Sequence, residues 1–265
     1  KKKKRSPNGS EKIGGVAATV TLSTEGQSAT FVYVDGTEGW INVQETSNSV
    51  AGRGFISATG GTITTCGNFK IHTFTGPGTF CVSSISSVAA ENTVGYLVVG
   101  GGGGGTGTLG GGAGGGGFRE GRNAPIDNFT ASPLVANAPT NAVTITATAF
   151  PITVGGGGPG ATDPGTNGSN SIFSTITSAG GGGGGRGAGQ PGSGGNGGSG
   201  GGGHGEATPG GGAAGSGNTP PVNPSQGQNG GSSSASSTQG AGGGGATGTG
   251  GNASGGLGSG SAGAG

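Results

Sequence analysis

Apolar side chains are distributed unevenly along this chain. Between residues 16 and 99, short apolar or alternating segments recur, separated by turn signals such as Asp35-Gly36 and Gly76-Pro77-Gly78. No stretch shows the three-to-four-residue spacing of an amphipathic helix. An all-β fold is therefore predicted, with strands at residues 16–22, 29–34, 40–43, 55–58, 62–65, 68–74, 79–83 and 94–99.

Alternation within these strands predicts which side chains face a core. In residues 69–74, Phe69 and Ile71 are expected to point inward, and Lys70 and His72 outward. The segment from Phe31 to Val34 is instead apolar on both faces. A strand covered on both sides in so small a segment favours a second copy of the chain covering one of them. We therefore expect a homo-oligomer, a trimer being favoured.

Beyond Val99 the chain becomes dominated by glycine, which makes up 76 of the 265 residues. From residue 180 onward it has no aromatic residue, and its only Leu and Val are Leu257 and Val222. Side chains cannot build a core here, although ordering each residue costs about 1–2 kcal/mol. Runs such as 100–105 break the strict collagen repeat. The sequence therefore predicts packed polyglycine II helices joined by lateral backbone hydrogen bonds.

Three regions are expected: a basic tail or linker at residues 1–15, a β-rich oligomerising module at 16–99, and a polyglycine II domain at 100–265. Within the last region, residues 143–146 and 172–176 read as strands or anchors that cap the lattice. The proline-rich stretch 219–224 is typical of an extended turn, and we expect it at a lattice tip. Loops at the ends of rigid rods are where recognition is usually placed.

Composition excludes several classes of partner. Charged residues make up 8% of the chain and its net charge is +1, so no nucleic-acid partner is expected. No apolar run reaches the 18–20 or so residues of a membrane span, so no membrane insertion is expected. Cys66 and Cys81 form neither a disulfide framework nor a zinc pattern. Pairing around Pro77 would place Cys81 opposite Thr73, which favours buried free thiols over a bridge between the two cysteines.

No catalytic constellation can be assembled from the sequence, so we expect a non-enzyme without cofactor. The repeated Gly-x-Gly-x-x-Gly matches lack a strand-turn-helix context and do not indicate nucleotide binding. His204 and Glu206 would lack a third metal ligand, so no metal is expected. Asn8, Asn128, Asn167 and Asn252 begin glycosylation patterns, which are chance matches in a phage protein but sugar sites in an extracellular one.

Three strand-to-glycine junctions carry a family resemblance: residues 95–100 (Gly-Tyr-Leu-Val-Val-Gly), 150–155 (Phe-Pro-Ile-Thr-Val-Gly) and 171–177 (Ser-Ile-Phe-Ser-Thr-Ile-Thr). Together with residues 26–40 upstream, they resemble the glycine-rich tail-fibre and appendage proteins of tailed bacteriophages, especially cyanobacterial phages. The resemblance implies a virion location, and a polyglycine lattice that displays loops to the host. It also implies two kinds of partner, other virion tail proteins and a host cell-surface glycan or outer-membrane protein.

Residues 118–122, followed by Asp127 and Phe129, form the most distinctive insert. Two guanidiniums, an aromatic ring and acids close together suit a saccharide or a neighbouring subunit. In the alternative interpretation, Arg119 and Glu120 pair and cap the lattice. The receptor-contact candidates are Arg119, Arg122, Asp127, Phe129, Asn167, Asn170, Pro220, Pro221, Gln226 and Gln228. The alternative function is a subunit of an extracellular filament or coat with a purely mechanical lattice.

Overall fold

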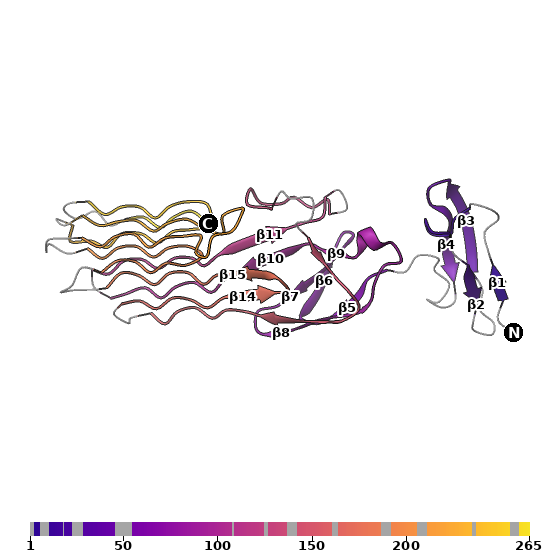
Figure 1. Ribbon diagram of the computed structural model, residues 1–265, viewed down its shortest axis with the longest axis horizontal. Helices are drawn as coiled ribbons and strands as arrows, with labels where there is room; N and C mark the ends of the chain where they lie inside the picture. Colours follow the sequence, from indigo (N-terminus) through magenta and orange to yellow (C-terminus); the bar gives the residue numbers. More distant parts are fainter. Residues whose placement is uncertain are drawn as a thin grey trace. The chain divides into compact units, whose positions relative to one another are not determined.

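The computed structural model (Figure 1) describes residues 3–5, 11–17, 19–22, 29–45, 55–107, 109–124, 127–136, 142–160, 164–186, 192–205, 211–234, 237–254 and 260–265. Over these residues the chain is all-β, with one 3₁₀ turn, η1 (Ala89–Glu91), and no α-helix. This confirms the predicted all-β class. The strands are β1 (Lys3–Arg5), β2 (Val20–Leu22), β3 (Ala29–Asp35), β4 (Gly39–Glu45), β5 (Ser57–Thr59), β6 (Thr62–Cys66), β7 (Phe69–Thr73), β8 (Gly78–Ser84), β9 (Thr93–Val94), β10 (Tyr96–Val99), β11 (Phe118–Gly121), β12 (Val143–Thr144), β13 (Ala149–Thr153), β14 (Ser171–Phe173) and β15 (Ile176–Ser178).

The strands form small sheets. Two-stranded sheets pair β1 with β2, β3 with β4, β6 with β7, β9 with β12 and β10 with β11. A five-stranded sheet has the order β15-β14-β13-β8-β5. The anchor expected at residues 143–146 corresponds to β12, whereas the one expected at 172–176 is a hairpin, in which β14 ends at Phe173, a turn follows and β15 begins at Ile176. Most predicted strands lie within two residues of an observed one, except that β2 begins four residues later and β9 and β10 divide the strand expected at 94–99.

The chain divides into two compact units. The N-terminal unit comprises residues 1–59, 81–93 and 144–148, and the glycine-rich unit comprises residues 60–80, 94–143 and 149–265. This division differs from the expected boundary at residue 99. Strand β10 belongs to the glycine-rich unit because it pairs with β11, and Phe69 of β7 belongs there because its ring packs edge-on against Phe129 at 6.0 Å.

Side chains hold the N-terminal unit together. Ile13 and Val20 are buried, and Ala29, Phe31 and Trp40 pack against them. This small cluster combines residues from the segment at 13–20 with residues from both strands of the β3–β4 hairpin. The β3–β4 hairpin therefore has a side-chain core on the face that carries Phe31.

An aromatic cluster forms the core of the glycine-rich unit at its strand end. Phe80 contacts Phe173 at 6.1 Å and Phe150 at 6.4 Å between ring centroids. His72 packs edge-on against Phe80 at 5.0 Å, and its Nδ1 lies 2.8 Å from the carbonyl oxygen of Gly60. Ile71 is 44% exposed. The predicted faces of β7 are therefore wrong for Ile71 and His72, because the packing partner of this two-stranded hairpin lies on the side of His72.

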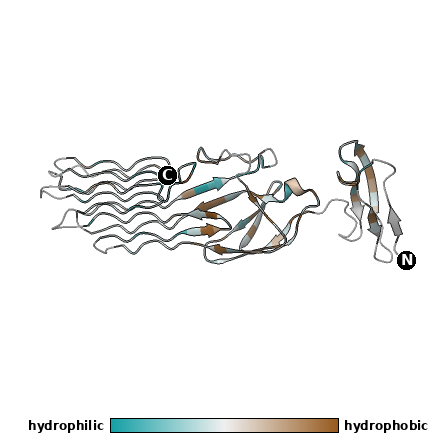
Figure 2. Cartoon of the chain, in the orientation of Figure 1, coloured by the Kyte–Doolittle hydropathy of each residue, from teal (hydrophilic) through white to brown (hydrophobic). Residues whose placement is uncertain are grey.

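The glycine segments run beside one another as regular ribbons (Figure 1) and are pale in Figure 2, where the brown, hydrophobic residues gather on the strands. Their backbone hydrogen bonds repeat every three residues. The amides of Gly100 and Gly103 donate to Gly117 and Gly114. Those of Gly101 and Gly104, one position on, donate to Ser169 and Thr166 in a different segment. Successive residues thus bond in different directions around the segment. We call the set of glycine segments after residue 99 that are joined by these bonds the lattice.

The innermost glycine segments are buried without any side-chain core. Residues 178–185, 197–205 and 241–245 are all buried. A methyl group on Gly201 would overlap the carbonyl oxygen of Gly183, and one on Gly182 would overlap that of Gly195. Glycine is therefore required here because neighbouring backbones approach closer than a Cβ permits.

Candidate functional site

The insert that begins with β11 is held by contacts within the glycine-rich unit. Arg119 Nη1 donates to the carbonyl of Thr177 at 3.3 Å. Glu120 accepts the amide of Ser132 at 2.8 Å and also its hydroxyl. Burial raises the pKa of the Tyr96 hydroxyl, an effect that neighbouring Arg119 opposes. Arg119 and Glu120 thus bind separate partners rather than forming the pair considered in the alternative interpretation.

The insert does bring Arg122, Asp127 and Phe129 together, as expected for a compact saccharide-binding cluster. Their contacts, however, lie within their own loop. Arg122 Nη1 donates to the carbonyl of Phe129 at 2.6 Å, and its Cζ lies 5.9 Å from the centre of the Phe129 ring. Asp127 Oδ2 accepts the amide of Asn123 at 2.7 Å. All three side chains are half-buried. Their contacts thus order the insert itself.

Asn167 and Asn170 are exposed, yet both bond to the backbone of the lattice. Asn167 Oδ1 accepts the amide of Gly183 at 2.8 Å, and its Nδ2 donates to the carbonyl of Asn196 at 3.0 Å. Asn170 Oδ1 accepts the amide of Gly180 at 3.0 Å. Each side chain therefore supplies the acceptor for a backbone amide that donates to no other glycine segment among the described residues.

The same arrangement recurs at three asparagines that the sequence reasoning did not select as contacts. Asn196 accepts the amide of Ser216, Asn229 that of Gly217 and Asn252 that of Ser232, each at 2.8 Å. The signal available in the sequence was an asparagine within or beside a glycine run. We call Asn167, Asn170, Asn196, Asn229 and Asn252 the asparagine face.

The proline-rich loop and its neighbours correct two expectations. Gln226 is 1% exposed. Its Oε1 accepts the amide of Ala179 at 2.9 Å and its Nε2 donates to the carbonyl of Pro220 at 2.8 Å. Gln226 is therefore wrong as a receptor contact. The main chain of Gln226 also accepts the amide of Phe118, the first residue of β11, so this loop lies at the strand end rather than at a lattice tip.

Pro220 and Pro221 are exposed at that strand end. Gln228 is half-buried, and its amide donates to Gly245 while its carbonyl accepts from Gly200. The backbone of Gln228 therefore belongs to the lattice. The ten candidates thus divide among the insert, the asparagine face, the proline-rich loop with Gln226, and the lattice segment that contains Gln228, rather than forming one site.

The end of the lattice away from the strands is closed by other contacts. His204 is 1% exposed, and its Nδ1 lies 3.0 Å from the carbonyl oxygen of Leu109. Thr106 donates its hydroxyl to Gly185 at 2.9 Å, and Arg186 beside it is exposed. No group of three metal-ligating side chains occurs among the residues that the structure describes. Glu206, considered with His204, lies outside them.

Both cysteines are free, as expected, but exposed rather than buried. Cys66 pairs with Phe69 across the β6–β7 hairpin, and Cys81 pairs with Thr59 in another sheet. The expected pairing of Cys81 with Thr73 is therefore wrong, because β8 pairs with β5 and β7 with β6.

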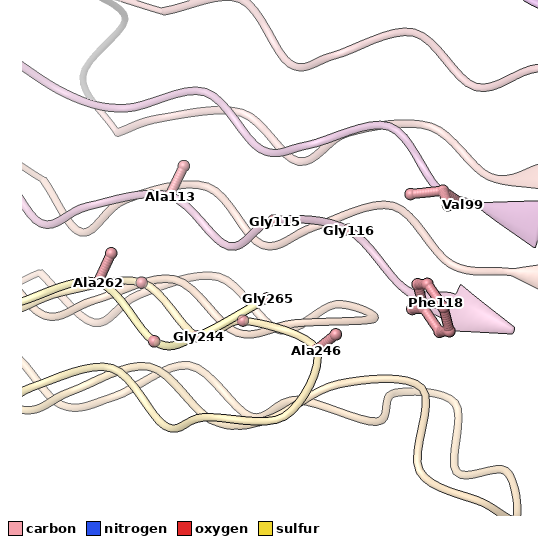
Figure 3. A pocket seen from close by; sticks show the side chains of 12 residues that line it. Val99, Ala113, Gly115, Gly116, Phe118, Gly244, Ala246, Ala262 and Gly265 are labelled. Carbon is pink, nitrogen blue, oxygen red and sulfur yellow. The ribbon is translucent and has the colours of Figure 1, made fainter. Parts of the chain in front are cut away.

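A groove of about 310 Å³ runs along one side of the glycine segments (Figure 3). One wall is formed by Ala113, Gly115 and Gly116, the other by Ala262, Gly263 and Gly265, and the floor by residues 243–246, with Val99 and Phe118 also lining the groove. Figure 3 shows the segment of Ala113 and Gly115 beside that of Ala262 and Gly265, with the Ala262 methyl group pointing towards the first segment and the Ala113 methyl group pointing away from the second. Most of the lining residues are glycines, and Val99, Phe118 and three alanines contribute the side chains.

In the N-terminal unit, an apolar surface remains uncovered on the β3–β4 hairpin. Val32, Tyr33, Val34 and Val43 are 47%, 48%, 49% and 56% exposed. Tyr33 keeps an edge-on contact with Trp40 at 5.5 Å. A single copy of this unit therefore leaves these side chains in water.

Comparisons with known proteins identify no relative of this chain. Neither the protein-family models, nor the curated proteins, nor the solved structures contain a match to this chain. Within the part of the chain described above, no helix has the length and apolar character needed to cross a membrane.

Proposed function

We propose that this chain is a non-catalytic structural protein of a bacteriophage tail fibre or related virion appendage, in which a polyglycine II lattice presents loops to the host surface. The observation that carries the proposal is the three-residue repeat of hydrogen bonds between glycine segments. Polyglycine II has three residues per turn and bonds only to neighbouring helices. The segment at 100–105 bonds in this way to residues 114–117, 166–169 and 181–184.

Backbone conformation supports the same lattice. Among the described glycines after residue 99, Gly116 alone has a positive φ, of 88°. Achiral glycine populates both signs of φ about equally, so a uniform sign indicates one helical hand. A single hand allows neighbouring helices to keep their donors and acceptors in register over several turns. The lattice would then be rigid enough to hold loops in fixed positions.

The course of the chain provides those loops. Gly195 and Gly198 donate to Gly183 and Gly180, so the segments at 180–185 and 192–198 are antiparallel and the chain reverses between them. The amides of Gly242 and Gly245 donate to Gly251 and Gly248 in the same antiparallel sense. The chain thus reverses repeatedly between bonded segments, and rigid scaffolds commonly carry recognition on such connections.

The two histidines favour a non-catalytic role. His72 contacts Phe80 and the carbonyl of Gly60, and His204 is buried against Leu109. A general base must reach a substrate and a nucleophile. Both imidazoles instead serve packing within the glycine-rich unit. This supports the proposal that the protein acts by binding and shape.

The exposed hairpin surface supports a homo-oligomer, for which we favour a trimer. Burying Val32, Val34 and Val43 between copies would remove apolar area worth roughly 25 cal/mol per Å². Native mass spectrometry of Val32→Asp with Val34→Asp should show dissociation to monomers. Wild-type chain that is monomeric at the same concentration would contradict the oligomer.

Cell labelling tests the proposed function. Fluorescently labelled chain should bind a subset of cyanobacterial strains, and Arg186→Ala or the pair Arg119→Ala and Arg122→Ala should reduce that binding. The variant Ala213→Ser, at an exposed lattice position, serves as the control. Chain that labels no bacterium and assembles alone into long fibres would favour the mechanical filament instead.

A further inference from the structure

We propose that the groove shown in Figure 3 is a docking site for residues 155–160 of a second copy of this chain. The inference concerns assembly and goes beyond the proposed host-recognition function. It depends on the hydrogen-bond geometry of the glycine-rich unit, and it stands whether or not the protein binds cells.

The groove is an unfilled position next to the segment at 240–245. On its other sides, that segment is surrounded by glycine-rich neighbours bonded through the backbone. The neighbours, each joined to it by a described hydrogen bond, are the segments at 111–117, 199–205, 226–233, 248–253 and 260–265. The groove lies between the first and the last of these. The lattice itself therefore shows what kind of segment fits there, an extended chain without Cβ atoms on its inner side.

The floor of the groove offers an unused donor. Ala241 and Gly244 donate to one neighbour, Gly203 and Gly200, while Gly242 and Gly245 donate to another, Gly251 and Gly248. Gly243 points in the remaining direction, lines the groove, and donates to no acceptor that the structure describes. Gly243 is also buried. Buried amides are nearly always paired, so an acceptor in the groove would complete this segment.

The wall at 111–117 offers the complementary group. The carbonyls of Gly114 and Gly117 accept from Gly103 and Gly100, and that of Gly112 accepts from Gly202. The carbonyl of Ala113 accepts from no described donor. A guest segment can thus accept from Gly243 and donate to Ala113. The asparagine face has no such opening, because its side chains already occupy the outward backbone donors.

The segment at 155–160 has the properties of that guest. Its described backbone bonds join it to residues 102 and 169, through Gly158 and Gly156. Gly156 and Gly157 are exposed, and their amides donate to no acceptor in the described part of the chain. A Cβ at Gly156 would meet nothing within 4 Å. At Gly156 and Gly157 this outer segment therefore presents free backbone donors on an open surface, and within residues 155–160 the only side chain is that of Pro159.

The groove and this segment are different surfaces of one chain, so the contact is heterologous. Each copy offers one groove and one segment. Contacts of this kind close into a ring or extend as an open array, according to the rotation between copies. Backbone hydrogen bonds would supply the specificity, as in the addition of a strand to a sheet edge.

Two leucine substitutions block the two surfaces separately. Gly115→Leu fills the groove, since a Cβ there meets only the carbonyl oxygen of Gly244 at 3.8 Å. Gly156→Leu blocks the segment. Ala213→Leu, at an exposed position of the segment at 211–218, adds the same side chain elsewhere and is the matched control. If Gly115→Leu lowers the unfolding midpoint, Ala262→Leu at the exposed opposite wall replaces it.

Sedimentation velocity of the full chain over a concentration series provides the readout. Wild type and Ala213→Leu should form species larger than the basic oligomer, and each blocking variant alone should weaken this association at least about tenfold. A mixture of Gly115→Leu and Gly156→Leu should recover paired species, because the groove of the second accepts the segment of the first. Association that is unchanged in the blocking variants, absent from wild type, or not recovered in the mixture overturns the proposal.

Discussion

The N-terminal unit and the glycine lattice are both ordered, but by opposite kinds of contact. In the first, Phe31, Trp40 and their neighbours hold two short strands by burying side chains. In the second, residues such as 199–205 are buried because nearly every side chain is missing, and the backbone bonds sideways. Burial alone therefore does not define a hydrophobic core. In the lattice, the informative substitution adds atoms, whereas in the side-chain cores it removes them.

The largest effect should come from adding a side chain at the centre of the lattice. Gly201→Val would drive its Cβ into the carbonyl of Gly183, and backbone on every side prevents relaxation. We expect a loss of more than about 4 kcal/mol in unfolding free energy, or failure to fold. Urea unfolding followed by circular dichroism measures it.

The matched variant is Gly156→Ala, at the lattice edge where a Cβ meets nothing within 4 Å. Its unfolding free energy should stay within about 0.5 kcal/mol of wild type. Similar losses in the two variants would mean that close backbone approach does not stabilise the lattice.

Removing a side chain from the aromatic cluster should give the next largest effect. Phe80 is 7% exposed and contacts Phe150, Phe173 and His72. Phe80→Ala should lower the unfolding free energy by about 3–5 kcal/mol, because it removes buried area and leaves a cavity. Phe80→Leu should recover more than half of the loss. An unchanged unfolding curve for Phe80→Ala would show that the cluster contributes little to the glycine-rich unit.

Sequence reasoning succeeded where a local pattern determines the structure. Alternation located most strands, and the lack of apolar residues after position 180 correctly indicated that side chains do not order that region. It failed where the partner is distant in sequence. The orientation of His72 depends on Phe80 in another strand, and the burial of Gln226 depends on Ala179 and Pro220. Nothing within the low-complexity stretch around Gln226 distinguishes it from half-buried Gln228.

A smaller effect should follow from removing one side chain of the asparagine face. Asn196 Oδ1 accepts the amide of Ser216 at 2.8 Å, and both residues are exposed. Asn196→Ala should cost about 0.5–1.5 kcal/mol of unfolding free energy, since water replaces the lost acceptor. Asn196→Asp keeps an acceptor in place and should cost less. Equal losses in the two variants would contradict a capping role for this side chain.

The smallest effect is expected in a turn of the N-terminal unit, where a side-chain oxygen accepts backbone amides that in the lattice would donate to backbone carbonyls. Asp35 Oδ1 accepts the amides of Glu38 and Thr37, each at 2.8 Å, and these bonds lower the pKa of the Asp35 carboxyl from 3.8. Because its pKa is lower in the folded than in the unfolded chain, Asp35 stabilises the fold above the unfolded pKa, and this contribution is lost as the pH falls through the folded pKa. Asp35→Asn keeps an acceptor but does not titrate. The difference in unfolding free energy between wild type and Asp35→Asn should therefore favour wild type near about pH 6 and shrink towards about pH 2.5, as measured by urea unfolding at both values. A difference that is independent of pH would show that the amide bonds to Asp35 do not depend on its charge.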